Sequence, residues 1–89
     1  IDEQQAILLI EDIIKGSKHS YKSNKEMWRC VLYLISYVNS EKLIEIMSNH
    51  ISGDNNLYRI KYTFLLNLLK EGEYFDNNLL AKYQLKWYH

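Results

Sequence analysis

The residue types that most often carry chemistry in proteins are few in this sequence and lie far apart. Its histidines are His19, His50 and His89, and its single cysteine is Cys30. They show neither the His-x-x-x-His nor the Cys-x-x-Cys spacing that brings two ligands to one metal ion. A glycine-rich phosphate loop and a Gly-x-Ser-x-Gly turn are also absent. The sequence therefore predicts no metal site, no cofactor and no catalytic residue, and we expect the chain not to be an enzyme.

Cys30 is expected to be a buried thiol, because it lies inside an apolar pattern that is typical of a helix. Its charged neighbour Arg29 would point about 100° away around such a helix and would do little to activate the sulfur. A single cysteine, in a sequence without an Asn-x-Ser/Thr glycosylation signal, favours a reducing compartment. We therefore expect an intracellular location, either cytoplasmic or nuclear.

A basic cluster lies in and just after the polar segment 16–24, which is predicted to be a loop. Its members are Lys18, Lys22, Lys25 and Arg29. Such side chains can contact nucleic-acid phosphates, although a solvated connection between helices is the favoured interpretation, because their spacing matches no phosphate-loop pattern. The 11 basic and 11 acidic residues of the sequence cancel, whereas nucleic-acid binders usually carry a basic excess. Nucleic-acid binding through this cluster is therefore the alternative function.

Helices must position all of these residues. The 89-residue sequence is 47% hydrophobic, contains no proline and has only three glycines, which favours helices over a many-turned β fold. Its longest apolar run, residues 6–10, is too short to span a membrane. We expect a single all-α domain over residues 1–89, or a piece of a larger helical protein, since the sequence begins with Ile1.

The hydrophobic spacing predicts about five helices in a compact array, and their short connections favour antiparallel, helical-repeat-like neighbours. The predicted helices are residues 2–15, 25–38, 41–49, 57–72 and 78–88. A strand is the competing interpretation of residues 6–10, but the flanking Gln, Glu and Asp are poor strand formers. Trp28 is expected in the core, and Tyr74 and Phe75 are expected to fold back as a hydrophobic plug.

The predicted helix 57–72 is expected to be the central packing element. Its apolar residues recur at three- and four-residue spacing and predict a broad buried stripe. The stripe consists of Leu57, Ile60, Phe64 and Leu68, widened by Leu65 and Leu69. This arrangement leaves an aromatic and basic flank, which we expect to face a partner or the rim of the core. The expected partner-binding residues are Tyr58, Arg59, Lys61 and Tyr62, together with Trp87 and Tyr88 at the end of the last helix.

Residues 40–75 resemble the stacked helix pairs of HEAT-like and PCI-associated helical repeats. The resemblance lies in a short helix, a turn, and a second helix with the leucine–x–arginine–isoleucine spacing of those repeats. The matching residues are Leu57, Arg59, Ile60, Leu65, Asn67, Leu68 and Leu69. The same segment is similar to the last helices of VHS-type domains and of domains that bind the polymerase C-terminal tail. The resemblance implies a scaffold that binds other proteins.

The sequence therefore favours a protein–protein interaction or scaffold module of a larger complex, which binds another protein or a second copy of itself. A small viral or bacterial regulatory helical bundle is a further alternative. The abundance of Asn, Lys, Ile and Tyr is typical of AT-rich genomes and fits such a source.

Overall fold

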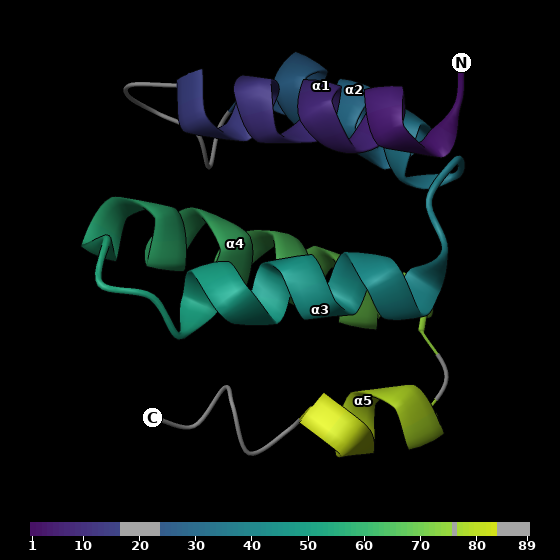
Figure 1. Ribbon diagram of the computed structural model, residues 1–89, viewed down its shortest axis with the longest axis vertical. Helices are drawn as coiled ribbons and strands as arrows, with labels where there is room; N and C mark the ends of the chain where they lie inside the picture. Colours follow the sequence, from purple (N-terminus) through teal and green to yellow (C-terminus); the bar gives the residue numbers. More distant parts are fainter. Residues whose placement is uncertain (17–23, 76, 84–89) are drawn as a thin grey trace. The chain divides into compact units, whose positions relative to one another are not determined.

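The computed structural model describes residues 1–16, 24–75 and 77–83, and these residues form an all-α structure, as predicted (Figure 1). Its helices are α1 (Glu3–Gly16), α2 (Lys25–Ile35), α3 (Ser40–Ile51), α4 (Asn56–Glu71) and the short α5 (Asn77–Tyr83). The chain divides into two units, Ile1–Asn39 and Ser40–His89. In the first unit α1 packs against α2, and in the second α3 packs against both α4 and α5. The strand alternative for residues 6–10 is wrong, because they lie inside α1.

α1 begins with a capping box, in which two side chains satisfy the free backbone N–H groups of the first turn. The N–H of Gln5 donates to Asp2 Oδ1 at 2.8 Å, and the N–H of Asp2 donates to Gln5 Oε1 at 3.3 Å. α1 and α2 run antiparallel (Figure 1). Glu3 Oε2 accepts a hydrogen bond from the N–H of Asn39 at 2.9 Å, which ties the start of α1 to the end of the unit.

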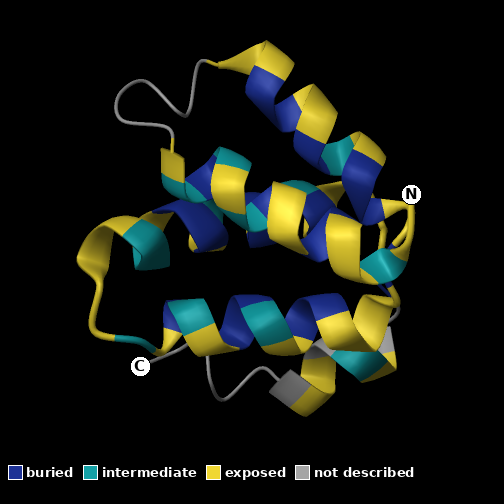
Figure 2. Cartoon of the chain, turned by 45° about the horizontal axis from the view of Figure 1, so that its top comes forward, coloured by how far each residue is buried: buried dark blue, intermediate teal, exposed yellow. Residues whose placement is uncertain are grey.

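The buried residues of the first unit follow helical spacing along one face of each helix (Figure 2). They are Ala6, Ile7, Ile10 and Ile14 on α1, and Met27, Trp28, Val31, Leu34 and Ile35 on α2. The prediction that Trp28 belongs to the core is confirmed. Asn24 caps α2, with Oδ1 accepting from the N–H of Met27 at 3.1 Å. α2 ends at Ile35, three residues before the predicted end, because the chain turns at Ser36.

In the second unit, Asn55 caps α4, and its Oδ1 accepts from the N–H of Tyr58 at 3.0 Å. The turn before this cap is held by Arg59, whose Nη2 donates to the carbonyl oxygen of Gly53 at 2.6 Å. α3 and α4 therefore form an antiparallel hairpin whose turn is fixed by side chains of α4 (Figure 1). α5 is joined to the first turn of α3 by an ion pair between Lys82 and Glu41.

The buried face of α4 differs from the one predicted. Leu57 and Ile60, expected in the core, are 45% and 50% exposed. The buried residues of α4 are Leu65 and Leu69 of the predicted stripe, together with Lys61, Tyr62 and Leu66. α4 is apolar over more than one face, and the apolar parts of Lys61 and Tyr62 can join a packed face. Helix periodicity therefore located α4 but did not select the face that packs.

α4 ends in a Schellman-type cap. The N–H of Tyr74 donates to the carbonyl oxygen of Leu69 and that of Glu73 to Lys70, at 3.0 and 3.2 Å. The residue with positive φ is Glu73, at 58°, one position after the predicted stop at Gly72. Of the predicted plug, Phe75 is buried, whereas Tyr74 is 48% exposed.

None of the helices in the described part of the chain has the length and apolar character that a membrane span requires.

Candidate partner-binding surface

The first unit carries an apolar groove between α1 and α2. Its volume is about 380 Å³, within the range of small ligand pockets, and it opens to solvent along one side. The residues that line it are Leu9 and Ile13 on α1, and Arg29, Cys30, Tyr33 and Leu34 on α2.

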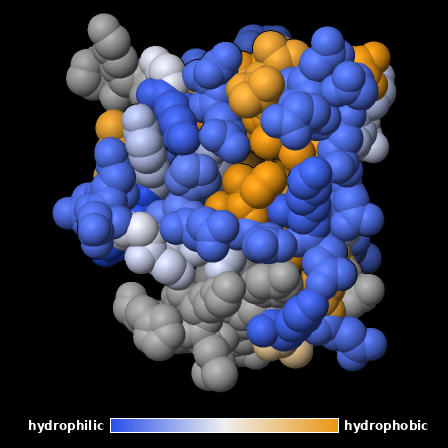
Figure 3. All heavy atoms as spheres, viewed as in Figure 1, coloured by the Kyte–Doolittle hydropathy of each residue, from blue (hydrophilic) through white to orange (hydrophobic). Residues whose placement is uncertain are grey.

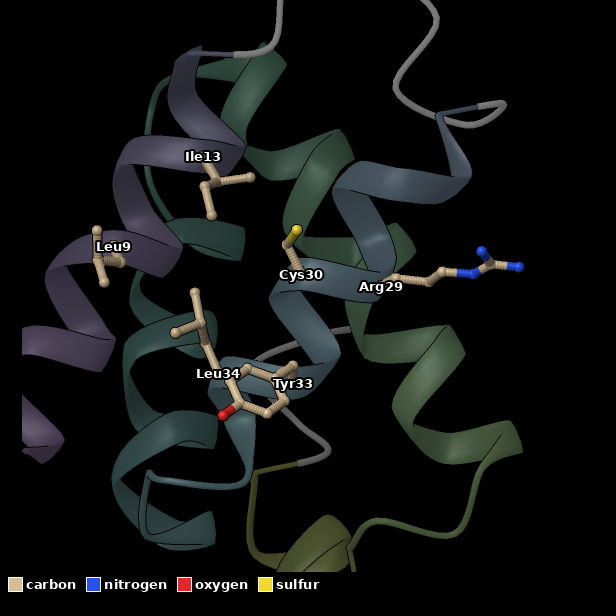
Figure 4. A pocket seen from close by; sticks show the side chains of 6 residues that line it. All are labelled: Leu9, Ile13, Arg29, Cys30, Tyr33 and Leu34. Carbon is tan, nitrogen blue, oxygen red and sulfur yellow. The ribbon is translucent and has the colours of Figure 1, made fainter. Parts of the chain in front are cut away.

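The side chains around the groove differ in direction (Figure 4). Leu9 and Ile13 reach in from α1, and Leu34 reaches toward them from α2. The guanidinium of Arg29 extends away from the opening, so it contributes its aliphatic stem to the wall. The lining is therefore almost wholly apolar, and its floor is formed by Leu34, which is 8% exposed.

The groove continues into exposed apolar surface. Its wall residues Leu9 on α1 and Tyr33 on α2 are 43% and 64% exposed. Figure 3 shows hydrophobic residues exposed among hydrophilic ones on the face of the molecule that it views. Exposed large apolar residues are ordinary when scattered, but a cluster beside a hollow is typical of an interaction site.

Each helix of this unit carries an ion pair, and the pair on α2 includes the groove residue Arg29. On α2, Arg29 Nη1 lies 3.1 Å from Glu26 Oε1, and both side chains are largely exposed. On α1, Lys15 Nζ lies 3.3 Å from Glu11 Oε2. Each helix therefore presents a neutral pair rather than a charge of one sign.

Two tyrosines one turn apart extend the apolar surface along α2. The hydroxyl groups of Tyr33 and Tyr37 are 2.9 Å apart, and the rings meet edge to face with centroids 5.6 Å apart. The hydrogen bond with Tyr33 raises the pKa of Tyr37 above its ordinary value. Tyr37 therefore stays neutral around pH 7.

The prediction that Cys30 is a buried thiol is wrong, since Cys30 is exposed. The buried face of α2 is centred on Val31 and Leu34, and Cys30 lies off that face, on the side that opens into the groove. α1 covers only one side of the broad apolar surface of α2. The thiol is therefore left as a wall residue of the groove.

The structure does not present the predicted α4 flank as a continuous free surface. Lys61 and Tyr62 are buried, at 0% and 1% exposure, and burial lowers the pKa of the Lys61 ammonium. Arg59 is half-buried and bonded to its own turn. Tyr58 is half-buried with its ring edge-on to His50. The structure therefore places Lys61 and Tyr62 in the packed face of α4 rather than on a flank beside it, while the part of these four residues in partner binding stays a prediction.

Other predicted site residues lie outside the described residues, namely Lys18, Lys22, Trp87 and Tyr88. Of the basic cluster, Lys25 and Arg29 are described, and both are exposed on α2. Within the described ranges, no group of three or more His, Cys, Asp or Glu side chains is placed to hold a metal ion.

The groove residues Leu9, Ile13, Tyr33 and Leu34 were not predicted as a site. One signal pointed to them: residues 6–10 are apolar all round, more than a single packing face needs. The repeat of tyrosine at positions 33 and 37 was a second signal, since residues four apart share a helix face.

No family model matches the chain, and comparisons with curated proteins and with solved structures find no match either. The resemblance to HEAT-like and PCI-associated repeats therefore stays a prediction.

Proposed function

We propose that the chain is a protein–protein interaction module whose α1–α2 groove receives an amphipathic helix of a partner protein. The observation that carries this proposal is the apolar groove bounded by Leu9, Ile13 and Tyr33. A channel between two antiparallel helices is a natural seat for a third, whose apolar residues at i, i+3, i+4 and i+7 fill it.

The chemistry around the groove supports a protein partner. An apolar centre with a polar rim is the usual anatomy of protein interfaces. The Glu26–Arg29 pair, which includes the groove residue Arg29, is neutral, so it matches a helix with charges of both signs beside its apolar stripe. A polyanion finds no excess of positive charge here, which makes nucleic acid the weaker candidate.

The finer architecture belongs to the same proposal. The helices pack as the antiparallel pairs α1·α2 and α3·α4, which is the building unit of helical-repeat scaffolds. A helical-repeat-like scaffold would use one face of such a pair to hold its partner.

A library of displayed helical peptides tests the proposal. Peptides of about 16 residues, randomised at every position, are selected on the purified chain, and binding of the selected peptides is compared between variants. Leu9→Asp should weaken them at least about tenfold, or roughly 1.4 kcal/mol, because a carboxylate would enter the apolar groove. Leu57→Asp is the matched control, since it makes the same change at a leucine of nearly equal exposure on α4.

Alkylation of Cys30 gives a second readout of the same groove. A bound peptide should slow the reaction of the exposed thiol with iodoacetamide, because Cys30 lies in the groove wall. Peptides that bind Leu9→Asp as tightly as the unaltered chain, or that leave the alkylation rate unchanged, would refute the groove as the binding site. If alkylation of Cys30 instead slows as the protein concentration is raised, and added peptide has no effect, the occupant of the groove is a second copy of the chain.

A further inference from the structure

His50 is enclosed by aromatic rings at the point where the α3–α4 hairpin turns. Its imidazole stacks on the ring of Tyr62 with centroids 4.3 Å apart and an interplanar angle of 8°. The ring of Tyr58 meets the same imidazole edge to face at 6.2 Å. Tyr58 and Tyr62 are four residues apart, so one side of α4 supplies both rings.

The stack is joined to the turn by backbone hydrogen bonds. The carbonyl oxygen of His50 accepts from the N–H of Gly53 at 3.2 Å, and the carbonyl oxygen of Gly53 accepts from Arg59 Nη2. A change in the position of His50 would therefore be transmitted directly to Gly53 and to the start of α4.

Two features of this site favour the protonated imidazole. His50 lies in the last turn of α3, where the helix dipole stabilises a positive charge. The face of Tyr62 is covered by the imidazole, and an aromatic face attracts a cation placed over it. Histidine is also the side chain whose ordinary titration falls between pH 5 and 8.

The other charged groups around the hairpin have mixed effects. Arg59 on α4 opposes protonation, but its guanidinium is held by the Gly53 carbonyl, and Asp54 in the turn is an exposed carboxylate. Lys61 is a second cation of α4, and burial lowers its pKa. From α5, Lys82 is paired with Glu41 at the opposite end of α3.

We propose that His50 is a pH-responsive latch, whose protonation tightens the stack on Tyr62 and thereby stabilises the α3–α4 turn. This device is independent of the α1–α2 groove, since every residue in it belongs to the second unit. Acidification across the histidine range would hold the hairpin closed, and a rise in pH would loosen it.

A stability comparison in a chain with one histidine tests the latch. His19 and His89 are replaced by Gln, and urea unfolding is measured at about pH 8 and about pH 5.5 with His50 intact and with His50→Phe. Phe keeps a ring on Tyr62 but carries no proton. On acidification, the unfolding equilibrium constant of the His50 chain should fall about fivefold relative to that of the His50→Phe chain. Equal pH dependence of the two chains, or relative destabilisation of the His50 chain in acid, would overturn the latch.

Hydrogen exchange provides the test if the Phe variant does not fold. In the chain with His50 as its only histidine, the protection factors of the Gly53 and Tyr58 amides should rise on acidification, after correction for intrinsic rates. In Tyr58→Leu, which removes the edge-on ring, this rise should be smaller. Protection factors that do not change between the two pH values would contradict the proposal.

Discussion

The backbone N–H of Tyr74 donates to the carbonyl oxygen of Leu69 at 3.0 Å, and this bond forces Glu73 between them into the left-handed conformation, with φ of 58°. The left-handed conformation costs a residue with a Cβ about 1–2 kcal/mol, whereas it costs glycine almost nothing. The only glycine nearby, Gly72, lies one position earlier, at φ of −82°. The cap therefore has the right backbone geometry with its glycine displaced by one residue.

Glu73→Gly should stabilise the chain by roughly 1 kcal/mol, because it removes the left-handed strain while leaving the cap hydrogen bonds in place. Thermal or urea unfolding measures the gain. Lys70→Gly is the control, since it places glycine at an exposed position inside α4 and should cost about 0.5–1 kcal/mol. A loss of stability in Glu73→Gly would show that the left-handed cap is not formed.

Gly72→Ala tests a close approach at the same cap. A Cβ at position 72 would meet Cε2 of the Tyr74 ring at 2.6 Å, so the half-exposed ring would have to move. We expect a loss of about 1 kcal/mol. In a Tyr74→Ala background the same change should be neutral or favourable, because alanine is the better helix former. A double-mutant cycle measures this coupling, and additive effects would contradict the contact.

Leu65→Ala and Leu57→Ala distinguish the two apolar faces of α4. Leu65 is fully buried, so its truncation should cost roughly 2–5 kcal/mol. Leu57 is 45% exposed, and its truncation should cost less than about 1 kcal/mol. Chemical denaturation of both variants measures the difference. Similar costs at the two positions would mean that α4 packs through the stripe that the sequence alone suggested.

Lys61→Met should raise stability at neutral pH, because burial penalises the Lys61 charge and lowers its pKa in the folded chain. Between that lowered pKa and the ordinary value of 10.5, the unfolded chain binds more protons than the folded one. Below this window, the buried charge of Lys61 lowers the free energy of unfolding by its full amount. As pH rises through the window, this destabilisation disappears and the free energy of unfolding increases.

Urea unfolding of the unaltered chain and of Lys61→Met is measured at several pH values, and the two free energies of unfolding are subtracted. The contributions of the ionisable groups that both proteins share largely cancel in this difference. The advantage of Lys61→Met should be constant near neutrality and shrink as pH approaches 10.5. An advantage that does not change with pH would show that the charge of Lys61 is not what burial penalises.

The all-α class and the starts of α2 and α4 could be predicted from the amino-acid sequence. The lack of proline and the three- and four-residue apolar spacing predicted an all-α chain, and cap residues such as Asn24 and Asn55 stand where α2 and α4 begin. These signals are local, because a cap bonds within three residues and a helix closes its hydrogen bonds within four. Helices and their caps can therefore be predicted without knowing which helices pack against one another.

Only the tertiary structure decided which apolar face each helix buries. Nearly the whole circumference of α2, and two faces of α4, are apolar enough to pack, so periodicity alone left several solutions. In the structure, Tyr62 and Leu65 of α4 are buried whereas Leu57 is 45% exposed. Cys30 of α2, which packs against α1, lines an open groove. Burial energy depends on the area that a neighbouring helix covers, and that neighbour comes from a distant part of the chain. The α1–α2 groove was therefore not predicted from the sequence, because its shape depends on how two helices pack against each other.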